Sequence, residues 1–292
     1  MNPVVLYFAS GESLYPGAAI LLIVIAISPL LRSLWLVRLR NISAWFALIM
    51  IVMACPPFPW IVDAAFLATF LLWYVGTNLR AYRKATRPAE AILAALLIIL
   101  SGLELRHRDL PLISGAPGDH LVVIGDSISA GIDPRVPTWP VVMEETLGVP
   151  VKNLSSAGAF ATDGLRMAAK VAPEDQVILI EIGGNDLIAG ALSSQFASSL
   201  EAILRKVTAP GRTVVMFELP LLPDRIAYGQ VQRRLAKKYG VWLIPKRYFV
   251  SVIGGANATS DGLHLLPEGT RRMADLVAQV LAPVLKPARP AA

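Results

Sequence analysis

Charged side chains are scarce in this sequence of 292 residues, since Asp, Glu, Lys and Arg together make up 16% and the apolar set makes up 55%. Soluble domains typically contain about 25% charged residues. Intrinsic disorder is excluded for the chain as a whole, because disordered chains are polar and highly charged. There is a single cysteine, Cys55, so no intrachain disulfide holds this fold together.

Basic patches are also missing, although the formal net charge is +6. Residues 1–119 hold 9 Lys/Arg and 6 Asp/Glu, and residues 120–292 hold 18 and 15, so each part carries +3. No run of Lys or Arg interleaved with aromatic residues occurs in either part. The sequence therefore predicts no nucleic-acid partner.

Long stretches without charge fill the first part of the chain. Residues 13–31 contain no charge, and between residues 41 and 79 the only charge is Asp63. A membrane span needs about 20 mainly apolar residues, and the prolines at 56, 57 and 59 would break a single long helix. We therefore expect a transmembrane helical domain at residues 1–110, with four spans at about 16–35, 42–56, 60–79 and 88–105.

The distribution of basic residues predicts the orientation of these spans. Residues 1–16 contain no Lys or Arg, which argues against a cleaved signal peptide. Lys and Arg favour the cytoplasmic side, so the two basic links should lie there, and Arg106 and Arg108 are outnumbered. The links carry Arg32, Arg38 and Arg40, and Arg80, Arg83, Lys84 and Arg87. The prediction is a multi-pass inner-membrane protein whose C-terminal domain faces the periplasm or cell exterior, and Asp63 is expected at the interface rather than in mid-membrane.

Strand-like and helix-like segments alternate in the second part of the chain. Short runs rich in β-branched residues occupy 121–125, 149–154, 176–182, 212–218 and 241–244, and helical patterns occupy 138–147, 163–171, 193–207, 226–239 and 267–285. Such alternation predicts an α/β domain with a parallel sheet and helices on both faces. We place this domain at residues 120–285, after a linker at 111–119 and before a disordered tail at 286–292.

A candidate nucleophile follows the first strand. In parallel sheets the chemistry lies beyond the carboxyl ends of the strands, where this chain has Gly125-Asp126-Ser127. The tripeptide alone is also typical of a turn or a helix cap, and a serine needs a base to become a nucleophile. His107 follows the fourth span and His120 precedes the first strand, which leaves His264, with Asp261 three residues earlier to orient it.

Candidate oxyanion donors follow the next two strands. Preorganised donors supply a large part of acyl-transfer catalysis. The second strand leads into residues 155–158 (Ser-Ser-Ala-Gly) and the third into residues 183–186 (Gly-Gly-Asn-Asp). The loop N–H groups and the Asn185 amide are candidates, whereas we interpret Asp186 as a residue that braces its loop.

Four blocks in this order resemble the SGNH, or GDSL, hydrolase superfamily over residues 120–285. The blocks are Gly125-Asp126-Ser127, Gly158, Gly184-Asn185-Asp186 and Asp261-x-x-His264, and the surrounding sequence is most similar to the thioesterase/lysophospholipase branch. The resemblance implies a three-layer flavodoxin-like fold with strand order 2-1-3-4-5. It also implies a triad of Ser127, His264 and Asp261 that needs no metal or cofactor, and an oxyanion hole made by Ser127, Gly158 and Asn185.

Three functions are compatible with this combination of domains. The first is a membrane-anchored serine esterase acting on a lysophospholipid, another acyl ester or an O-acetylated envelope glycan, with membrane lipids around its spans. The second is an O-acyltransferase that moves an acyl group from the same serine onto an envelope glycan. The third is a non-catalytic envelope-binding module on a hydrolase fold, against which the complete set of four blocks argues.

Overall fold

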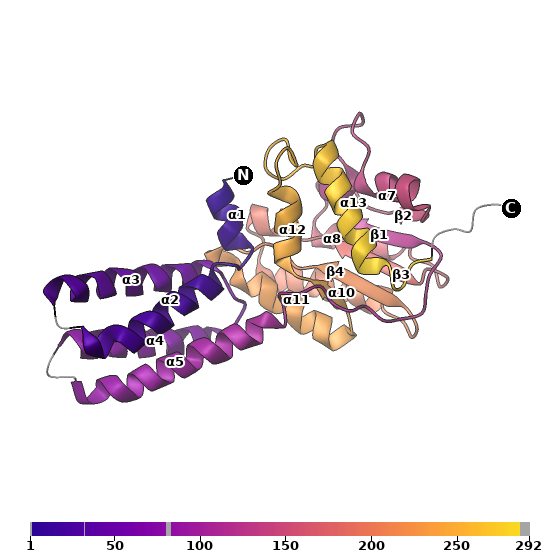
Figure 1. Cartoon of the computed structure of the whole chain (residues 1–292). Coiled ribbons are helices and arrows are strands. Elements are labelled where there is room, and N and C mark those ends of the chain that lie inside the picture. The colour runs from indigo at the N-terminus through magenta and orange to yellow at the C-terminus, as the bar shows by residue number, and fades with distance from the viewer. Residues whose placement is uncertain (1, 32, 80–82, 287–292) are drawn as a thin grey trace. The chain divides into compact units, whose positions relative to one another are not determined.

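The structure, a computed structural model, describes residues 2–31, 33–79 and 83–286 and divides into two compact units (Figure 1). The helical unit comprises residues 7–109 and 221–226, and the α/β unit comprises residues 1–6, 110–220 and 227–292. The predicted disordered tail, apart from Lys286, lies outside the described residues.

The long helices of the helical unit lie side by side (Figure 1), whereas the short helix at the start of the chain is bent by 79° from the one that follows it. α1 (Pro3–Ala9) and α2 (Leu14–Ile27) precede the 3-10 turn Ser28–Leu30, and α3 (Leu34–Met53), α4 (Trp60–Asn78) and α5 (Arg83–Leu105) follow. Within the described chain, α3, α4 and the Thr86–Leu105 part of α5 are long and apolar enough to cross a membrane. Pro3–Ala9 and Leu14–Leu30 pass the same test only together, as a pair bent by 79°.

The observed helix bounds correct the predicted spans at several ends. The helix expected at 16–35 stops at Leu30, after Pro29 has removed a backbone donor, and α3 begins at Leu34 rather than near residue 42. Arg40 therefore lies inside α3, where its guanidinium donates to Ser28 Oγ at 3.2 Å and to Asn78 Oδ1 at 2.9 Å. These polar partners allow Arg40 to be buried within a helix. From its charge we had expected it in the link between the first two spans. α3 also ends at Met53 instead of residue 56, and α5 begins at Arg83 instead of residue 88.

The outer surface of the helical unit is apolar. Its interior is filled by side chains such as Leu21, Phe70, Trp73 and Leu93, which are fully buried. Large apolar side chains also point outward on every long helix: Ile23, Trp35, Ile42, Ile49, Ile61, Leu72, Ile92 and Ile98. Exposed apolar area on this scale indicates a lipid or protein neighbour rather than water.

The α/β unit is organised around a five-stranded parallel sheet. Its strands are β1 (Leu121–Gly125), β2 (Val151–Asn153), β3 (Val177–Glu181), β4 (Thr213–Phe217) and β5 (Trp242–Ile244). They pair in the order β2-β1-β3-β4-β5, and every pairing is parallel. The predicted α/β class and strand order are confirmed.

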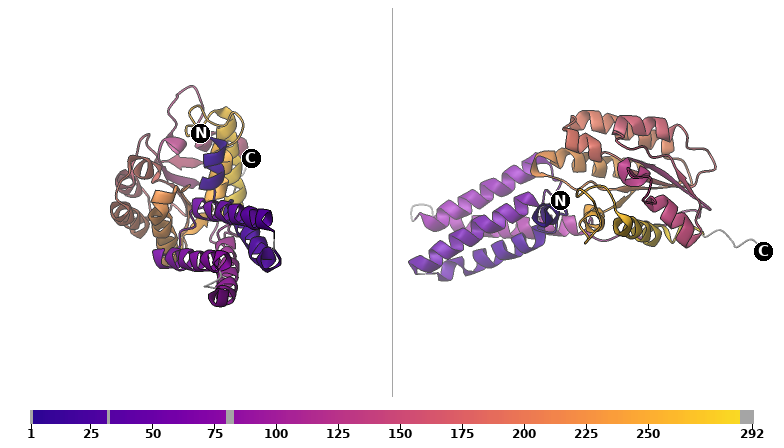
Figure 2. Two further views of the ribbon diagram at one scale, coloured as in Figure 1. Left: turned by 90° about the vertical axis from the view of Figure 1, so that its left-hand side faces the viewer. Right: turned by 90° about the horizontal axis from the view of Figure 1, so that it is seen from above.

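Helices cover both faces of this sheet (Figure 2). α7 (Trp139–Leu147), α12 (Lys246–Ile253) and α13 (Pro267–Leu281) cover one face, where Val123, Leu179 and Phe217 join the main apolar core. α8 (Ala161–Ala168), α10 (Ser193–Val207) and α11 (Ile226–Tyr239) cover the other. All residues of β1, β3 and β4 are buried, as expected for strands covered on both faces.

Short helices at the strand ends were not predicted. α6 (Ser127–Ala130) follows β1, and α9 (Gly184–Ala189) follows β3. Both are too short to show a helical period in the sequence. They matter because they carry Ser127 and Asn185 at the edge of the sheet where the carboxyl ends of the strands meet.

Candidate active site

The turn between β1 and α6 positions Ser127. The Asp126 side chain accepts a hydrogen bond from the Ile128 N–H at 3.0 Å, which caps α6. A Cβ at Gly125 would lie 2.8 Å from Ser129 Oγ and 2.9 Å from Glu181 Oε2, so only glycine fits there. The turn is thereby held in one geometry, and Ser127 begins the helix directly beyond the sheet.

Ser127, His264 and Asp261 form a continuous hydrogen-bonded chain. Ser127 Oγ lies 3.1 Å from His264 Nε2, and His264 Nδ1 lies 2.6 Å from Asp261 Oδ2. Because an ionised carboxylate only accepts, Nδ1 carries the proton and Nε2 is free to accept the serine proton. The structure thus brings together the three residues that the sequence proposed for the triad.

Asp261 is held as an anion by the loop between α12 and α13. Its Oδ1 accepts the backbone N–H of Leu263 at 3.0 Å and that of His264 at 2.9 Å. Burial alone would raise the pKa of Asp261, but hydrogen bonds from the backbone and imidazole of His264 and from Leu263 outweigh it and lower that pKa to about 2. The carboxylate is therefore charged across the neutral range and can stabilise a protonated imidazole.

Donors gather in the loop that follows β2. Gly158 has a φ of +73°, and the Ala159 N–H donates to Ser156 O at 3.2 Å, which closes a turn around residues 157 and 158. Within the described part of the chain, no hydrogen bond uses the N–H of Ser127, Ala157 or Gly158. Such unoccupied N–H groups can bind an anion.

Asn185 lies against the same loop. Its Nδ2 donates one hydrogen to Ala159 O at 2.9 Å, and an amide nitrogen has a second hydrogen to offer. The neighbouring Asp186 is buried and accepts the Ala161 N–H at 2.8 Å, while its own backbone oxygen accepts the Tyr228 hydroxyl at 3.1 Å. Asp186 therefore ties α9, the helix that carries Asn185, to the start of α8.

The two other histidines are placed elsewhere. His120 lies at the amino end of β1, where Nε2 is 2.8 Å from Asp175 Oδ1 and Nδ1 is 2.5 Å from Asp119 Oδ1. His107 belongs to the helical unit. Of the three histidines, His264 is the one in contact with Ser127.

A buried polar network beneath Ser127 was not anticipated. Glu181 Oε2 accepts the Ser129 hydroxyl at 2.9 Å, and Trp139 Nε1 donates to Ser129 Oγ at 3.1 Å. Burial raises the pKa of Asp126 to about 6 and raises the pKa of the fully buried Glu181, whose Oε2 accepts the Asp126 backbone N–H at 3.4 Å. Two adjacent buried carboxyl groups share at least one proton, because two like charges cannot both form there.

One sequence signal pointed to this network. Glu181 is the single charged residue of the strand Val177–Glu181, which is otherwise apolar and buried. A charged residue in such a strand needs a partner, and the pairing of Gly125 with Glu181 in adjacent strands places Asp126 beside it.

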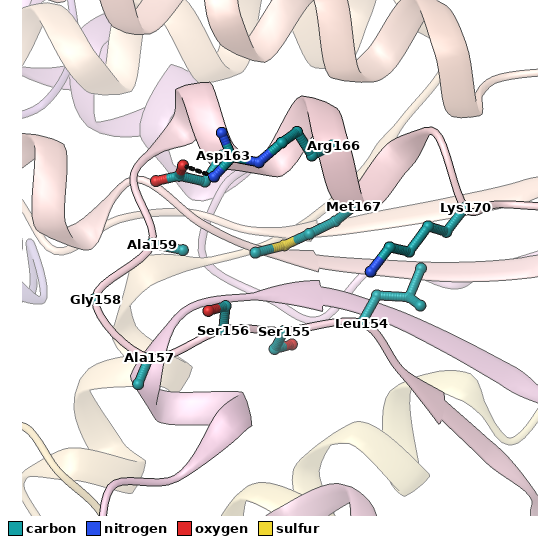
Figure 3. Close-up of a pocket in the computed structure, with 10 residues that line it drawn as sticks. All are labelled: Leu154, Ser155, Ser156, Ala157, Gly158, Ala159, Asp163, Arg166, Met167 and Lys170. Atoms are coloured by element: carbon teal, nitrogen blue, oxygen red, sulfur yellow. Dashed lines mark hydrogen bonds and ion pairs between the residues drawn. The ribbon is translucent and has the colours of Figure 1, made fainter.

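Two hollows adjoin these residues. Ser127 and His264 line a small one of about 20 Å³. A larger cavity of about 520 Å³ lies between the loop after β2 and α8, with Gly158 on its wall (Figure 3). In the described part of the chain, no three His, Cys, Asp or Glu side chains lie close enough together to hold a metal ion.

Comparison with known proteins decides the family. Residues 123–272 match the GDSL-like Lipase/Acylhydrolase family. The chain belongs to this family. It is therefore an enzyme, a serine hydrolase that acts on ester bonds, and the predicted resemblance over the catalytic domain is confirmed.

Curated relatives and a solved structure cover the α/β unit. The chain is 29% identical to Esterase TesA of Pseudomonas aeruginosa over 186 residues, which is 58% of this chain and 91% of the relative. It is 26% identical to Thioesterase 1/protease 1/lysophospholipase L1 of Escherichia coli over 180 residues, 58% of this chain and 86% of the relative. The crystal structure of TesA superimposes with a TM-score of 0.50 at 28% identity and covers 57% of this chain and 99% of that chain. The family assignment thus concerns the hydrolase domain and leaves the helical unit outside it.

Proposed function

We propose that this GDSL hydrolase is a membrane-anchored serine esterase that uses Ser127, His264 and Asp261. The observation that carries the proposal is the hydrogen-bonded chain from Ser127 Oγ through His264 to Asp261. Ser127 Oγ attacks the ester carbonyl carbon, and His264 Nε2 takes the serine proton. His264 then protonates the departing alcohol, and a water molecule, activated by the same imidazole, releases the acid and restores Ser127.

The oxyanion of the tetrahedral intermediate is held by three donors. These are the N–H of Ser127, the N–H of Gly158 and the free hydrogen of the Asn185 amide. The support is that none of these hydrogens is used within the described chain and that the Asn185 side chain on α9 is joined by its hydrogen bond to Ala159 O to the loop that carries Gly158. Donors fixed in advance cost no reorganisation when charge develops.

The proposed substrates are carboxylic esters of the cell envelope. Relatives bear the names thioesterase, lysophospholipase and arylesterase, and the apolar helices offer an anchor close to lipid. Lysophospholipids, other acyl esters and O-acetylated glycans are within reach of an enzyme anchored in this way. We place the protein in the cell membrane with the α/β unit outside the cytoplasm, because the basic residues cluster in the links before α3 and before α5 and within the first turns of these helices.

The test is hydrolysis of short p-nitrophenyl esters by the full-length protein in detergent. Ser127→Ala should lower kcat/KM by about 10⁴-fold or more, because the nucleophile is gone. Ser198→Ala, which removes the hydroxyl of an exposed serine on α10, should leave the rate within twofold. A Ser127→Ala protein with wild-type activity and wild-type thermal unfolding would contradict the assignment.

The acceptor of the acyl group is tested in the same assay. With a sugar acceptor added, the esterase proposal predicts free acid as the main product at an unchanged rate. An esterified sugar as the main product would assign acyl transfer to Ser127 instead.

A further inference from the structure

The proposed reaction gives no role to the 520 Å³ cavity beside Gly158. Its volume falls within the range of small-molecule sites, about 300–1,000 Å³. Gly158 lies on its wall, and an added Cβ at this glycine would meet nothing within 4 Å. The cavity therefore reaches the backbone of Gly158, one of the proposed oxyanion donors.

Hydrogen-bond donors line the side of the cavity formed by the loop. Ser156 lies in the stretch of loop before Gly158, and its side chain points toward α8 (Figure 3). Neither the Ser156 hydroxyl nor the Ala157 N–H is hydrogen-bonded in the described structure. Unused donors of this kind favour a ligand that accepts hydrogen bonds.

The charge on the α8 side is positive. Arg166 and Asp163 neutralise each other through an ion pair of 2.5 Å, and Asp163 also accepts the Phe160 N–H at 2.9 Å. Lys170 extends into the cavity toward Leu154 (Figure 3) and has no carboxylate partner among the described residues. Lys170 is exposed, so its positive charge lies at the solvent-facing rim of the cavity, at the end away from Gly158.

We propose that this cavity binds an anionic group of the substrate, a phosphate or a carboxylate, with Lys170 as its counter-charge. The proposal rests on the esterase function and specifies its substrate class: the ester carries a negative charge several bonds from the carbonyl. Leu154 and Met167 line the space between the two polar ends and suit the carbon skeleton that joins ester and anion.

The experiment compares three esters with the full-length protein in detergent. p-Nitrophenyl butyrate is neutral, mono-p-nitrophenyl glutarate carries a carboxylate on the acyl side, and 3-carboxy-4-nitrophenyl butyrate carries one on the alcohol side. Lys170→Met should lower kcat/KM about tenfold for an anionic ester, mainly through KM, and leave the neutral ester within twofold. The anionic ester that loses activity shows which side of the substrate enters the cavity.

Two controls make the result specific. Lys170→Arg keeps the charge and should retain the preference, and Lys206→Met removes an exposed lysine of α10 outside the cavity and should change nothing. An equal response of all three esters to Lys170→Met, or no response, would overturn the proposal while neutral-ester hydrolysis still supports the esterase.

A second measurement does not depend on hydrolysis. Phenyl phosphate, which has no carboxylic ester, is titrated calorimetrically into wild type and Lys170→Met in the same detergent. Binding to wild type that weakens about tenfold in the variant supports the anion site. Equal binding to both proteins, or binding to neither, would contradict it even if no ester were hydrolysed.

Discussion

At the scale of single residues, Ser127 lies next to a pair of buried carboxyl groups, those of Asp126 and Glu181. Asp126 caps the helix that begins with Ser127, and Glu181 accepts a hydrogen bond from the Ser129 hydroxyl two residues further along. Trp139 completes the network by donating to the same hydroxyl. The raised pKa values of Asp126 and Glu181 favour a protonated carboxyl group in this buried pair.

That proton gives the stability a predicted pH dependence. Burial raises the pKa of Asp126 from 3.8 to about 6 and raises the pKa of Glu181 as well, so the folded protein retains a proton that the unfolded chain has released. The free energy of unfolding must then fall as the pH rises through and above the range from about 4 to 6. Glu181→Gln removes the group that holds this proton. Between pH 5 and 7 we therefore expect the melting temperature of the variant to fall less steeply with pH than that of wild type, and the two slopes should differ by about 3–5 °C per pH unit.

The measurement is thermal unfolding of full-length protein followed by tryptophan fluorescence. Glu268→Gln, which alters a partly exposed carboxylate on α13 paired with Arg271 and Arg272, serves as the control and should keep the wild-type slope. Parallel slopes for wild type and Glu181→Gln would show that no proton is held there.

At the scale of elements, the turn from β3 into α9 determines where Asn185 lies. Gly183 adopts a φ of +110°, and a Cβ there would lie 2.6 Å from Phe196 Cε2. Phe196 is fully buried and stacks on Tyr228 at a ring distance of 4.7 Å, so it cannot move aside. The tight fit of this turn against α10 keeps Asn185, a proposed oxyanion donor, at the edge of the sheet.

Gly183→Ala should therefore damage catalysis as well as stability. The alanine must displace α9 or Phe196, and we expect kcat to fall about tenfold or more, because small displacements of catalytic groups are costly. Gly211→Ala is the matched control, since Gly211 has a φ of +79° but open space around its Cβ position. If both variants lose kcat equally, backbone strain alone explains the loss and the fit against Phe196 has no catalytic role.

The sequence predicted the strands and the residues that meet at Ser127 better than the network beneath them. Runs such as Val177–Glu181 are apolar and rich in β-branched residues, and the blocks around Ser127 and His264 lie at loop positions that local patterns identify. The contact between Asp126 and Glu181 follows from the register of β1 with β3, which no local pattern specifies. The start of α3 was missed for a similar reason, because the partner that holds Arg40, Asn78, is 38 residues away.

At the scale of the whole molecule, two units of different character share one chain. The helical unit exposes apolar side chains along its long helices, whereas the α/β unit keeps its apolar strands between two layers of helices. This contrast is the physical basis for proposing that the first unit lies in lipid and the second in water.

The proposed orientation is tested by reporter fusions. Alkaline phosphatase fused after residue 115 should be active, because it folds outside the cytoplasm, and a green fluorescent protein fused at the same position should be dark. A fusion after residue 84 should show the reverse. An inactive phosphatase with a bright fluorescent fusion at residue 115 would place the α/β unit in the cytoplasm.

The central claim is that Ser127 is the nucleophile of this esterase. A fluorophosphonate reacts covalently with an activated serine. Intact-mass and peptide analysis of the treated full-length protein therefore tests the claim directly. The account predicts one adduct per chain, located on the peptide that contains Ser127, and much slower labelling in His264→Ala. Modification of another serine, or undiminished labelling of Ser127→Ala, would contradict it.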